Sequence, residues 1–295
     1  MKQFNAELIL QANAELAEGP VWREEEKKLY WVDINIGILH RFDPETGKDE
    51  AFACGEPIGT VAFRKDGGLI AALKSGIWLL DIEGDSLKKT FLVNPEPDTP
   101  NRFNDGKCDA AGRFLAGTCY TPVKDGEDIL GGFYTVDADG NFRTLIDGRY
   151  ISNGLCFSED NKTLYYVDSF DHCVAAYDYD LTDGSIKNRR VIITIEDNIP
   201  DGMTIDTEGT LWVALFGGGK VLRIDPEKGE VIAEVLVPAK KVTCPVFGGD
   251  DFSALYITTA WENSTPEEKE ADPLGGSLFV LRPGVKGYPS FRFGK

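Results

Sequence analysis

The chain has 295 residues, of which 42% are hydrophobic and 27% are charged. It therefore has enough apolar material for a folded core and is neither a disordered nor a collagen-like chain. Its 31 Lys and Arg residues against 49 Asp and Glu residues give a net charge of −18, which disfavours nucleic acids and anionic membranes as partners because like charges repel.

The N-terminal segment is interrupted by polar residues, and no stretch of the chain approaches 18 apolar residues. We therefore expect neither a signal peptide nor a transmembrane helix. The six cysteines are scattered and form no CxxC pair, which argues against a zinc cluster or a disulfide framework. Reduced thiols in a cytoplasmic protein fit this pattern best.

One pattern recurs six times along the chain: a short strand, a polar turn, and a second strand rich in aliphatic and aromatic residues. The second strands begin at Leu29, Leu69, Phe114, Leu164, Leu211 and Leu255, so the steps between them are 40, 45, 50, 47 and 44 residues. A third strand and often a fourth follow, with turn sequences such as DPETG and DPEKG. Repeats of this length are typical of four-stranded propeller blades. We predict an all-β, six-bladed β-propeller that forms a single domain over residues 1–295; two β-sandwiches would not explain six near-copies.

Short strands are also expected at the two ends of the chain, outside the six repeats. They cover Asn5 to Leu10 and Ser290 to Phe293. A ring of blades has to close, so we expect these N- and C-terminal strands to close it, one of them completing the last blade. The main insertion, Glu262 to Asp272, is acidic and polar, and we expect it to be mobile.

The first strand of each repeat opens with a short motif that usually contains glycine. When the motifs are aligned on the residue before the glycine, four of the six positions carry oxygen ligands, namely Glu18, Asp105, Asn153 and Asp201. Inner strands of a propeller converge on its axis, and crowded carboxylates repel one another unless a cation lies between them. Hard divalent cations prefer such oxygen donors. The alternative is that each Asx-Gly is ordinary turn chemistry, but the repetition favours a metal site.

Two other side chains are candidates for the mouth of this channel. Arg102 precedes the third inner strand and could hold an oxygen-rich ligand, although an isolated surface arginine is an equally good interpretation. His172 lies on a loop between two strands, where a solvent-facing turn residue is a better interpretation than a catalytic base.

The chain resembles the SMP-30/gluconolactonase/regucalcin-like family over nearly its whole length. The motifs that carry the resemblance are Glu18-Gly19-Pro20-Val21-Trp22, Arg102-Phe103-Asn104-Asp105-Gly106-Lys107, Ser152-Asn153-Gly154-Leu155 and Pro200-Asp201-Gly202-Met203. The resemblance implies a six-bladed propeller with one divalent metal held by Glu18, Asn153 and Asp201. It further implies that Arg102 and Asn104 contact a sugar, and that Asp201 is both a ligand and a candidate general base. Asp105 would lie in the channel beside the ligands.

The chain departs from the animal members of this family at Thr121, where they have a glutamate that touches the sugar. We keep Thr121 as a candidate substrate contact, but the identity of the substrate does not carry over. The C-terminal sequence GVKGYPSFRF looks more like that of bacterial sugar-lactone hydrolases.

The resemblance implies metal-dependent hydrolysis of a sugar-acid lactone to the open acid. The metal is one of Ca²⁺, Zn²⁺, Mn²⁺, Mg²⁺ or Fe²⁺. One alternative is an organophosphate or aryl-ester hydrolase, whose apolar mouth would be supplied by Tyr120, Phe170, Phe216 and Trp261. The other is a non-enzymatic, calcium-binding regulatory propeller. We expect a monomer or weak dimer with a small-molecule partner and with neither nucleic acid nor membrane as a partner.

Overall fold

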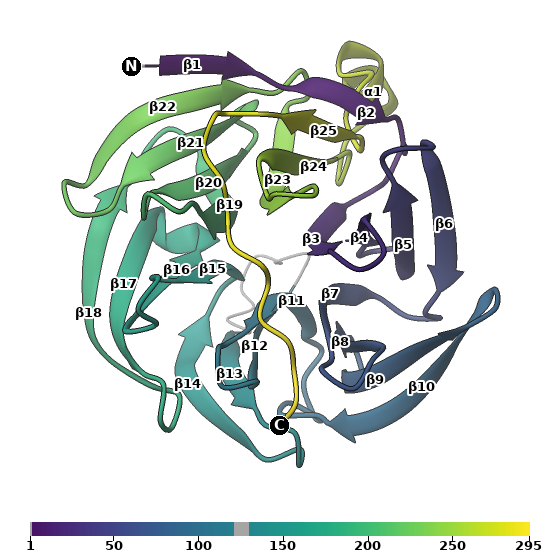
Figure 1. Ribbon diagram of the computed structural model, residues 1–295, viewed down its shortest axis with the longest axis vertical. Helices are drawn as coiled ribbons and strands as arrows, with labels where there is room; N and C mark the ends of the chain where they lie inside the picture. Colours follow the sequence, from purple (N-terminus) through teal and green to yellow (C-terminus); the bar gives the residue numbers. More distant parts are fainter. Residues whose placement is uncertain (1, 121–129) are drawn as a thin grey trace.

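The computed structural model describes residues 2–120 and 130–295, and within them six β-sheets are arranged as a ring around a central channel (Figure 1). The prediction of a six-bladed β-propeller is confirmed. In each blade the first strand of the repeat lies innermost and the later strands follow outward by antiparallel pairing. In the part of the chain that the structure describes, no helix is both long and apolar enough to cross a lipid bilayer.

The first three blades follow the chain in order. Their strands, from the channel outward, are β3 (Ala17–Arg23), β4 (Lys28–Asp33), β5 (Ile38–Asp43) and β6 (Lys48–Ala53); β7 (Ile58–Phe63), β8 (Leu69–Leu73), β9 (Gly76–Glu83) and β10 (Ser86–Val93); β11 (Arg102–Cys108), β12 (Phe114–Cys119), β13 (Gly131–Val136) and β14 (Phe142–Arg149).

The last three blades continue the same order. Their strands are β15 (Ser152–Phe157), β16 (Thr163–Asp168), β17 (Cys173–Asp180) and β18 (Ser185–Thr194); β19 (Ile199–Ile205), β20 (Leu211–Phe216), β21 (Lys220–Asp225) and β22 (Glu230–Leu236); β23 (Lys241–Gly248), β24 (Ala254–Ala260) and β25 (Leu278–Leu281). A 3-10 turn, η1 (Ser169–Asp171), separates β16 from β17.

The N-terminal residues close the ring. Strand β2 (Glu7–Leu10) pairs with β25 as the fourth strand of the last blade, with Leu8 opposite Phe279. The preceding strand, β1 (Lys2–Asn5), adds a fifth, parallel strand to the neighbouring blade by pairing with β22. The expectation that one end strand completes the last blade is therefore correct for the N-terminal end.

The C-terminal residues do not form the closing strand that was predicted for them. Residues 290–293 form no strand in any blade; Phe293 makes a single parallel bridge with Arg64. The segment instead runs across one face of the ring, over the channel (Figure 1). It is fixed on one side by Gly287 N–H, which donates to Phe252 O, and on the other by Phe293 N–H, which donates to Phe63 O. We call residues 286–294 the C-terminal strap, and the face that it crosses the lower face.

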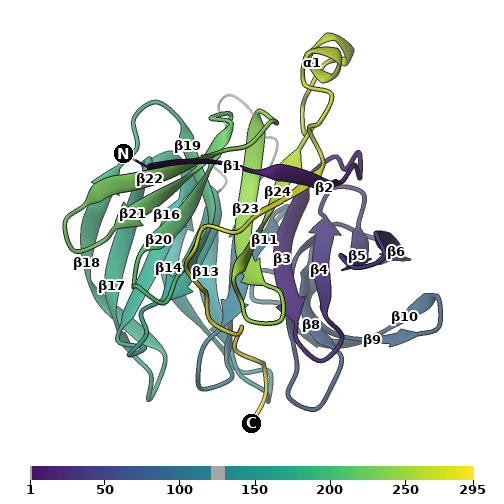
Figure 2. The ribbon, with the colours of Figure 1, turned by 45° about the horizontal axis from the view of Figure 1, so that its top comes forward.

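The opposite, upper face is where the inner strands begin. Helix α1 (Pro266–Ala271) stands above this face within the acidic insertion (Figure 2). The insertion was expected to be mobile, yet a capping box starts the helix: Thr265 Oγ1 accepts from Glu268 N–H, and the Glu268 carboxylate accepts from Thr265 N–H.

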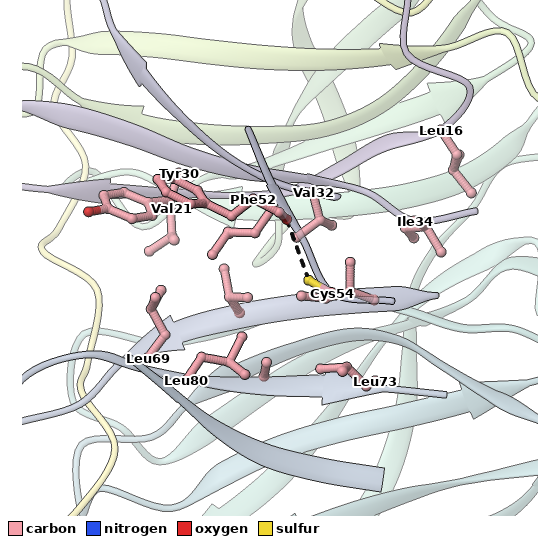
Figure 3. Packing of buried hydrophobic residues seen from close by; sticks show 14 of the residues in the cluster. Leu16, Val21, Tyr30, Val32, Ile34, Phe52, Cys54, Leu69, Leu73 and Leu80 are labelled. Atoms are coloured by element: carbon pink, nitrogen blue, oxygen red, sulfur yellow. Dashed lines mark hydrogen bonds between the residues drawn. The ribbon is translucent and has the colours of Figure 1, made fainter. Parts of the chain in front are cut away.

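Apolar side chains fill the space between neighbouring blades. Figure 3 shows one such cluster, in which Tyr30, Val32 and Phe52 of the first blade pack against Leu69 and Leu80 of the second. Strand residues alternate between two faces, and each blade is covered on both faces, so both sets are apolar in β4 and β8. This packing fixes the inner strands relative to one another, and with them the groups that line the channel.

Candidate metal and substrate site

Every inner strand breaks its pairing register at the motif found in the sequence. The breaks fall between Glu18 and Val21, Ile58 and Thr60, Phe103 and Gly106, Ser152 and Leu155, Pro200 and Met203, and Val242 and Pro245. Such a bulge leaves residues outside the ladder and changes the direction in which their side chains point. The repeated motif is therefore a repeated bulge at the same level of the channel.

The glycines of these motifs allow the inner strands to approach one another. A Cβ atom on Gly154 would lie 2.4 Å from Asp201 O, and one on Gly202 would lie 2.4 Å from Cys244 Sγ. Neither distance is possible for a real side chain without a shift of the neighbouring strand. The glycines thus bring the ligand-bearing strands of adjacent blades close together.

Three carboxyl groups from alternate blades act on one another in the channel. Glu18, Asp105 and Asp201 are each less than a tenth exposed. Burial raises the pKa of Glu18 well above its usual range, and the charges of Asp201 and Asp105 raise it further. The pKa of Asp201 is also raised well above its usual range, by burial and then by Asp105. Burial raises the pKa of Asp105 too, against the opposing charge of Lys107.

Two oxygen atoms at this level have no partner in the fold. Asn153 Oδ1 and Asp105 Oδ2 are buried and accept no hydrogen bond from any described residue. The Asn153 amide is oriented by its Nδ2, which donates to Ser169 Oγ at 3.0 Å. The same side chain lowers the pKa of Asp201, against the larger rise that burial causes. Ser169 Oγ in turn donates to Pro200 O at 2.8 Å. An unpartnered amide oxygen beside buried carboxylates fits a hard divalent cation.

The predicted ligand set contains two carboxylates and one amide. Within residues 2–120 and 130–295, no three His, Cys, Asp or Glu side chains lie close enough together to hold a metal ion among themselves. A cation at this level would thus need the amide oxygen of Asn153, as the set of Glu18, Asn153 and Asp201 supplies. The two remaining aligned positions carry Ile58 and Cys244, which are buried and offer no oxygen ligand.

Arg102 and Asn104 lie beside the carboxyl cluster and are bonded to each other. Arg102 Nη1 donates to Asn104 Oδ1 at 2.7 Å and to Phe103 O at 3.0 Å, while Asn104 Nδ2 donates to Ser152 O at 2.9 Å. The positive charge of Arg102 lowers the pKa of Glu18, which places the guanidinium group within electrostatic reach of the cluster. The third candidate substrate contact, Thr121, lies outside the described residues.

One carboxylate at the upper end of the channel does not stand out in the sequence. Glu262, one residue beyond Trp261, raises the pKa values of both Asp201 and Cys119, which belong to different blades. Its Oε1 accepts from Asn35 Nδ2 at 3.1 Å, and its backbone O accepts from Lys241 Nζ. Glu262 is the first residue of the acidic insertion that we expected to be mobile. Because the insertion contains several other acidic residues, nothing in the sequence marks Glu262 as a residue of the channel.

The other residues considered at the mouth are less central. His172 is half-buried at the end of η1, with Nδ1 3.2 Å from Asn198 O, in agreement with a turn role. Phe170 is 49% exposed, whereas the ring of Phe216 lies under Lys241 Nζ. Trp261 Nε1 donates to Asp272 O and so supports the insertion.

A cavity of about 400 Å³ occupies the lower half of the channel. Its walls are mostly apolar and include Val21, Val61, Cys108, Cys156 and Val246. The C-terminal strap closes it from below with Tyr288 and Phe291. The cavity also reaches Asp105 and Lys107, so its mostly apolar walls extend up to the carboxyl cluster.

Comparison with known proteins connects this geometry to relatives. The family model for the SMP-30/Gluconolactonase/LRE-like region matches residues 16–261. A regucalcin of Xenopus laevis is 41% identical over 97% of each chain, and a putative sugar lactone lactonase of Bacillus subtilis is 38% identical over 98% of this chain and 99% of its own. A regucalcin structure from Agrobacterium tumefaciens, described as a calcium-binding protein, superposes with a TM-score of 0.92 at 29% identity, covering 100% of this chain and 99% of its own.

Proposed function

The chain belongs to the SMP-30/Gluconolactonase/LRE-like family, and from this premise we propose that it hydrolyses the lactone of a sugar acid at the upper end of its channel. One divalent cation would be held there by Glu18, Asn153 and Asp201. The name of the Bacillus subtilis relative supports the substrate class, and the description of the Agrobacterium tumefaciens relative supports a cation such as calcium.

The observation that carries the proposal is the set of buried, mutually repelling carboxyl groups beside an unpartnered amide oxygen. Desolvation and like charge raise the pKa values of Glu18 and Asp201 in the absence of a cation. Burying unpaired charge is costly, so a fold that keeps such groups together needs a positive partner for them. Asn153 Oδ1, which has no partner among the described residues, completes an all-oxygen donor set.

A divalent cation supplies Lewis acidity, which polarises a carbonyl group and makes a water molecule more acidic. The side chains of the protein would do the rest. Arg102, held in place by Asn104 Oδ1, would donate hydrogen bonds to oxygens of the substrate. Asp201 would take a proton from the attacking water on a carboxylate oxygen and deliver it to the ring oxygen that leaves. Water thereby adds to the carbonyl carbon, the ring C–O bond breaks, and a hydroxy acid is formed.

The same site would suit an aryl ester or an organophosphate if the substrate carried an apolar group. The observation in favour of this second function is the exposed ring of Phe170, which follows Ser169, the residue that orients Asn153. The relatives' names favour the lactone, so we keep the ester as the alternative.

The test is an acid-release assay with protein stripped of metal by EDTA and then supplied with one divalent cation at a time. Glucono-, xylono-, arabinono- and galactono-lactones would be compared with paraoxon and an aryl ester. Metal-dependent opening of a sugar lactone above its spontaneous rate supports the proposal. Turnover of paraoxon or the aryl ester alone would favour the alternative, and calcium binding by calorimetry without any turnover would point to a non-enzymatic role.

A further inference from the structure

The carboxylate of Glu96 accepts hydrogen bonds from four side chains at the upper end of the third blade. Glu96 lies in the connection between β10 and β11. Its Oε1 accepts from Thr118 Oγ1 at 2.7 Å and from Tyr134 Oη at 2.5 Å. Its Oε2 accepts from Asn101 Nδ2 at 2.6 Å and from Thr99 Oγ1 at 3.0 Å. All four of these partners are neutral donors, so the group acts as an acceptor on both oxygens.

The donors tie Glu96 to both ends of the connection between β12 and β13. Thr118 is in β12, near the point where that connection leaves the described chain, and its Oγ1 accepts from Gly132 N–H at 2.8 Å. Asn101 Nδ2 also donates to Leu130 O at 3.2 Å, where the described chain resumes. One carboxylate thus links described residues on the two sides of residues 121–129, namely Thr118 directly and Leu130 through Asn101.

The same carboxylate fixes the start of the strand that carries Arg102. Asn101 is 4% exposed and immediately precedes Arg102, whose Cα pairs with that of Cys119. Because Oε2 of Glu96 receives the Asn101 amide, the main chain at the root of the Arg102 side chain is held in place. The position of Arg102 therefore depends on a residue that belongs to the connection from the preceding blade.

We propose that Glu96 is a positioning residue for the substrate side of the site. It would set the place of Arg102, and it would do so without touching the substrate or the cation. This inference rests on the proposed function, because Arg102 is a substrate contact only if that function is correct.

A purely structural role for Glu96 makes a different prediction, and Asp109 provides the matched control. Asp109 also accepts several hydrogen bonds, from Arg113 Nε at 2.7 Å and from Tyr179 Oη at 2.6 Å, but it follows the lower end of β11. If the carboxylates at the two ends of this blade only stabilise it, then Glu96→Gln and Asp109→Asn would affect catalysis alike. If Glu96 positions Arg102, then only Glu96→Gln would change substrate affinity.

The experiment compares the wild type, Glu96→Gln and Asp109→Asn in the full-length protein. In Glu96→Gln, one carboxylate oxygen is replaced by an NH₂ group that cannot accept hydrogen bonds, so the hydrogen bonds accepted by that oxygen are lost together with the negative charge. The measurements are KM and kcat for D-glucono-1,5-lactone, calcium affinity by calorimetry, thermal unfolding, and amide hydrogen exchange. We expect Glu96→Gln to raise KM about tenfold, as for the loss of a hydrogen bond to a charged group, with kcat and calcium affinity retained. Exchange should become faster at residues 101–104 and 130–132 but not at the strands of Glu18 or Asp201.

An unchanged KM for Glu96→Gln would overturn the proposal. So would a joint loss of kcat, calcium affinity and stability that Asp109→Asn reproduces. If the wild type opens no sugar lactone, the proposed function fails by itself, and hydrogen exchange then decides the role of Glu96. Faster exchange confined to residues 101–104 and 130–132 would support it, and unchanged exchange there would refute it.

Discussion

Asp201 lies near the start of β19 and Asp206 directly follows its end; both are buried, but their surroundings differ. The Oδ2 atom of Asp206 accepts from Trp212 Nε1 at 2.9 Å and from Arg223 Nη2 at 2.7 Å, and its Oδ1 accepts from Thr210 N–H at 2.9 Å. The pKa of Asp201 is raised by burial and by the charges of Asp105 and Glu262, and only the Asn153 side chain and the Gly202 backbone act in the opposite direction.

Strand β11 repeats this contrast. Asp109, after its lower end, is paired with Arg113, whereas Asp105, near its upper end, keeps an oxygen without a partner in the described part of the protein. The acidic side chains are thus buried at both levels of the ring, but they differ in their hydrogen-bond and ion-pair partners. The lower acids Asp109 and Asp206 are paired with arginines, whereas Glu18, Asp105 and Asp201 form no ion pair with a described Lys or Arg side chain. Four predictions test whether this difference separates structure from function.

The largest effect is expected for Asp201→Asn. The substitution removes the proposed proton acceptor and one cation ligand, so lactone turnover should fall by about 10²–10⁴-fold. Because it also removes a charge that repels Glu18, the metal-free protein should become more stable than the wild type. Steady-state kinetics and thermal unfolding in EDTA check the two parts. Full activity in this variant would end the mechanism.

Asp206→Ala should lower the stability of the protein and leave its activity unchanged. Loss of the carboxylate leaves the guanidinium group of Arg223, which is largely buried, without its main partner, and breaking such a pair costs about 3–5 kcal/mol of unfolding free energy. Calcium affinity and the kcat of the folded protein should be retained. Denaturant unfolding with parallel calorimetry measures both; a loss of calcium affinity without a loss of stability would contradict the comparison.

The stability of the metal-free protein should fall as the pH rises above the ordinary carboxyl range. The pKa values of Glu18 and Asp201 are raised in the folded state, so their contribution to stability is fully present below about pH 4 and is lost as the pH rises through the raised values. Surface acids do not mask this slope, because a group such as Glu50, with a pKa of about 2, loses its contribution at much lower pH. Saturating calcium should abolish the slope, and thermal unfolding with and without calcium tests this.

The smallest effect is expected for Arg102→Ala. The variant loses donors to the substrate, so KM should rise about tenfold while kcat changes little. Since Arg102 also lowers the pKa of Glu18, calcium affinity should decrease slightly, and calorimetry would detect this. An unchanged KM would show that the guanidinium group only holds Asn104 in place and does not contact the substrate.

The sequence predicts the ring and the level of the site because both are repeated. The same strand pattern occurs six times, and the aligned residues Glu18, Asp105, Asn153 and Asp201 reach one level of the channel without further information. Side chains that have no equivalent in the other repeats cannot be predicted in this way. Glu262 reaches the channel from an insertion.

Two further features depend on contacts between distant segments. Glu96 bonds to residues of β12 and β13 in the next blade and to Asn101, which precedes β11. The strap pairs Phe293 with Arg64 instead of joining a blade, because every blade already has its fourth strand. Short apolar runs at the end of a chain give no indication of which of these outcomes is realised.

The pairing of β2 with β25 has a consequence for how the chain reaches its native state. Leu8 can pair with Phe279 only once residue 279 has been synthesised, so a strand near one end of the sequence stays unpaired until a strand near the other end is available. Contacts of such long sequence separation slow folding, because the chain loses conformational entropy on closing the loop before the favourable contact forms. During synthesis the blades form a chain with an open edge at each end, and that edge is the surface that a chaperone would have to cover.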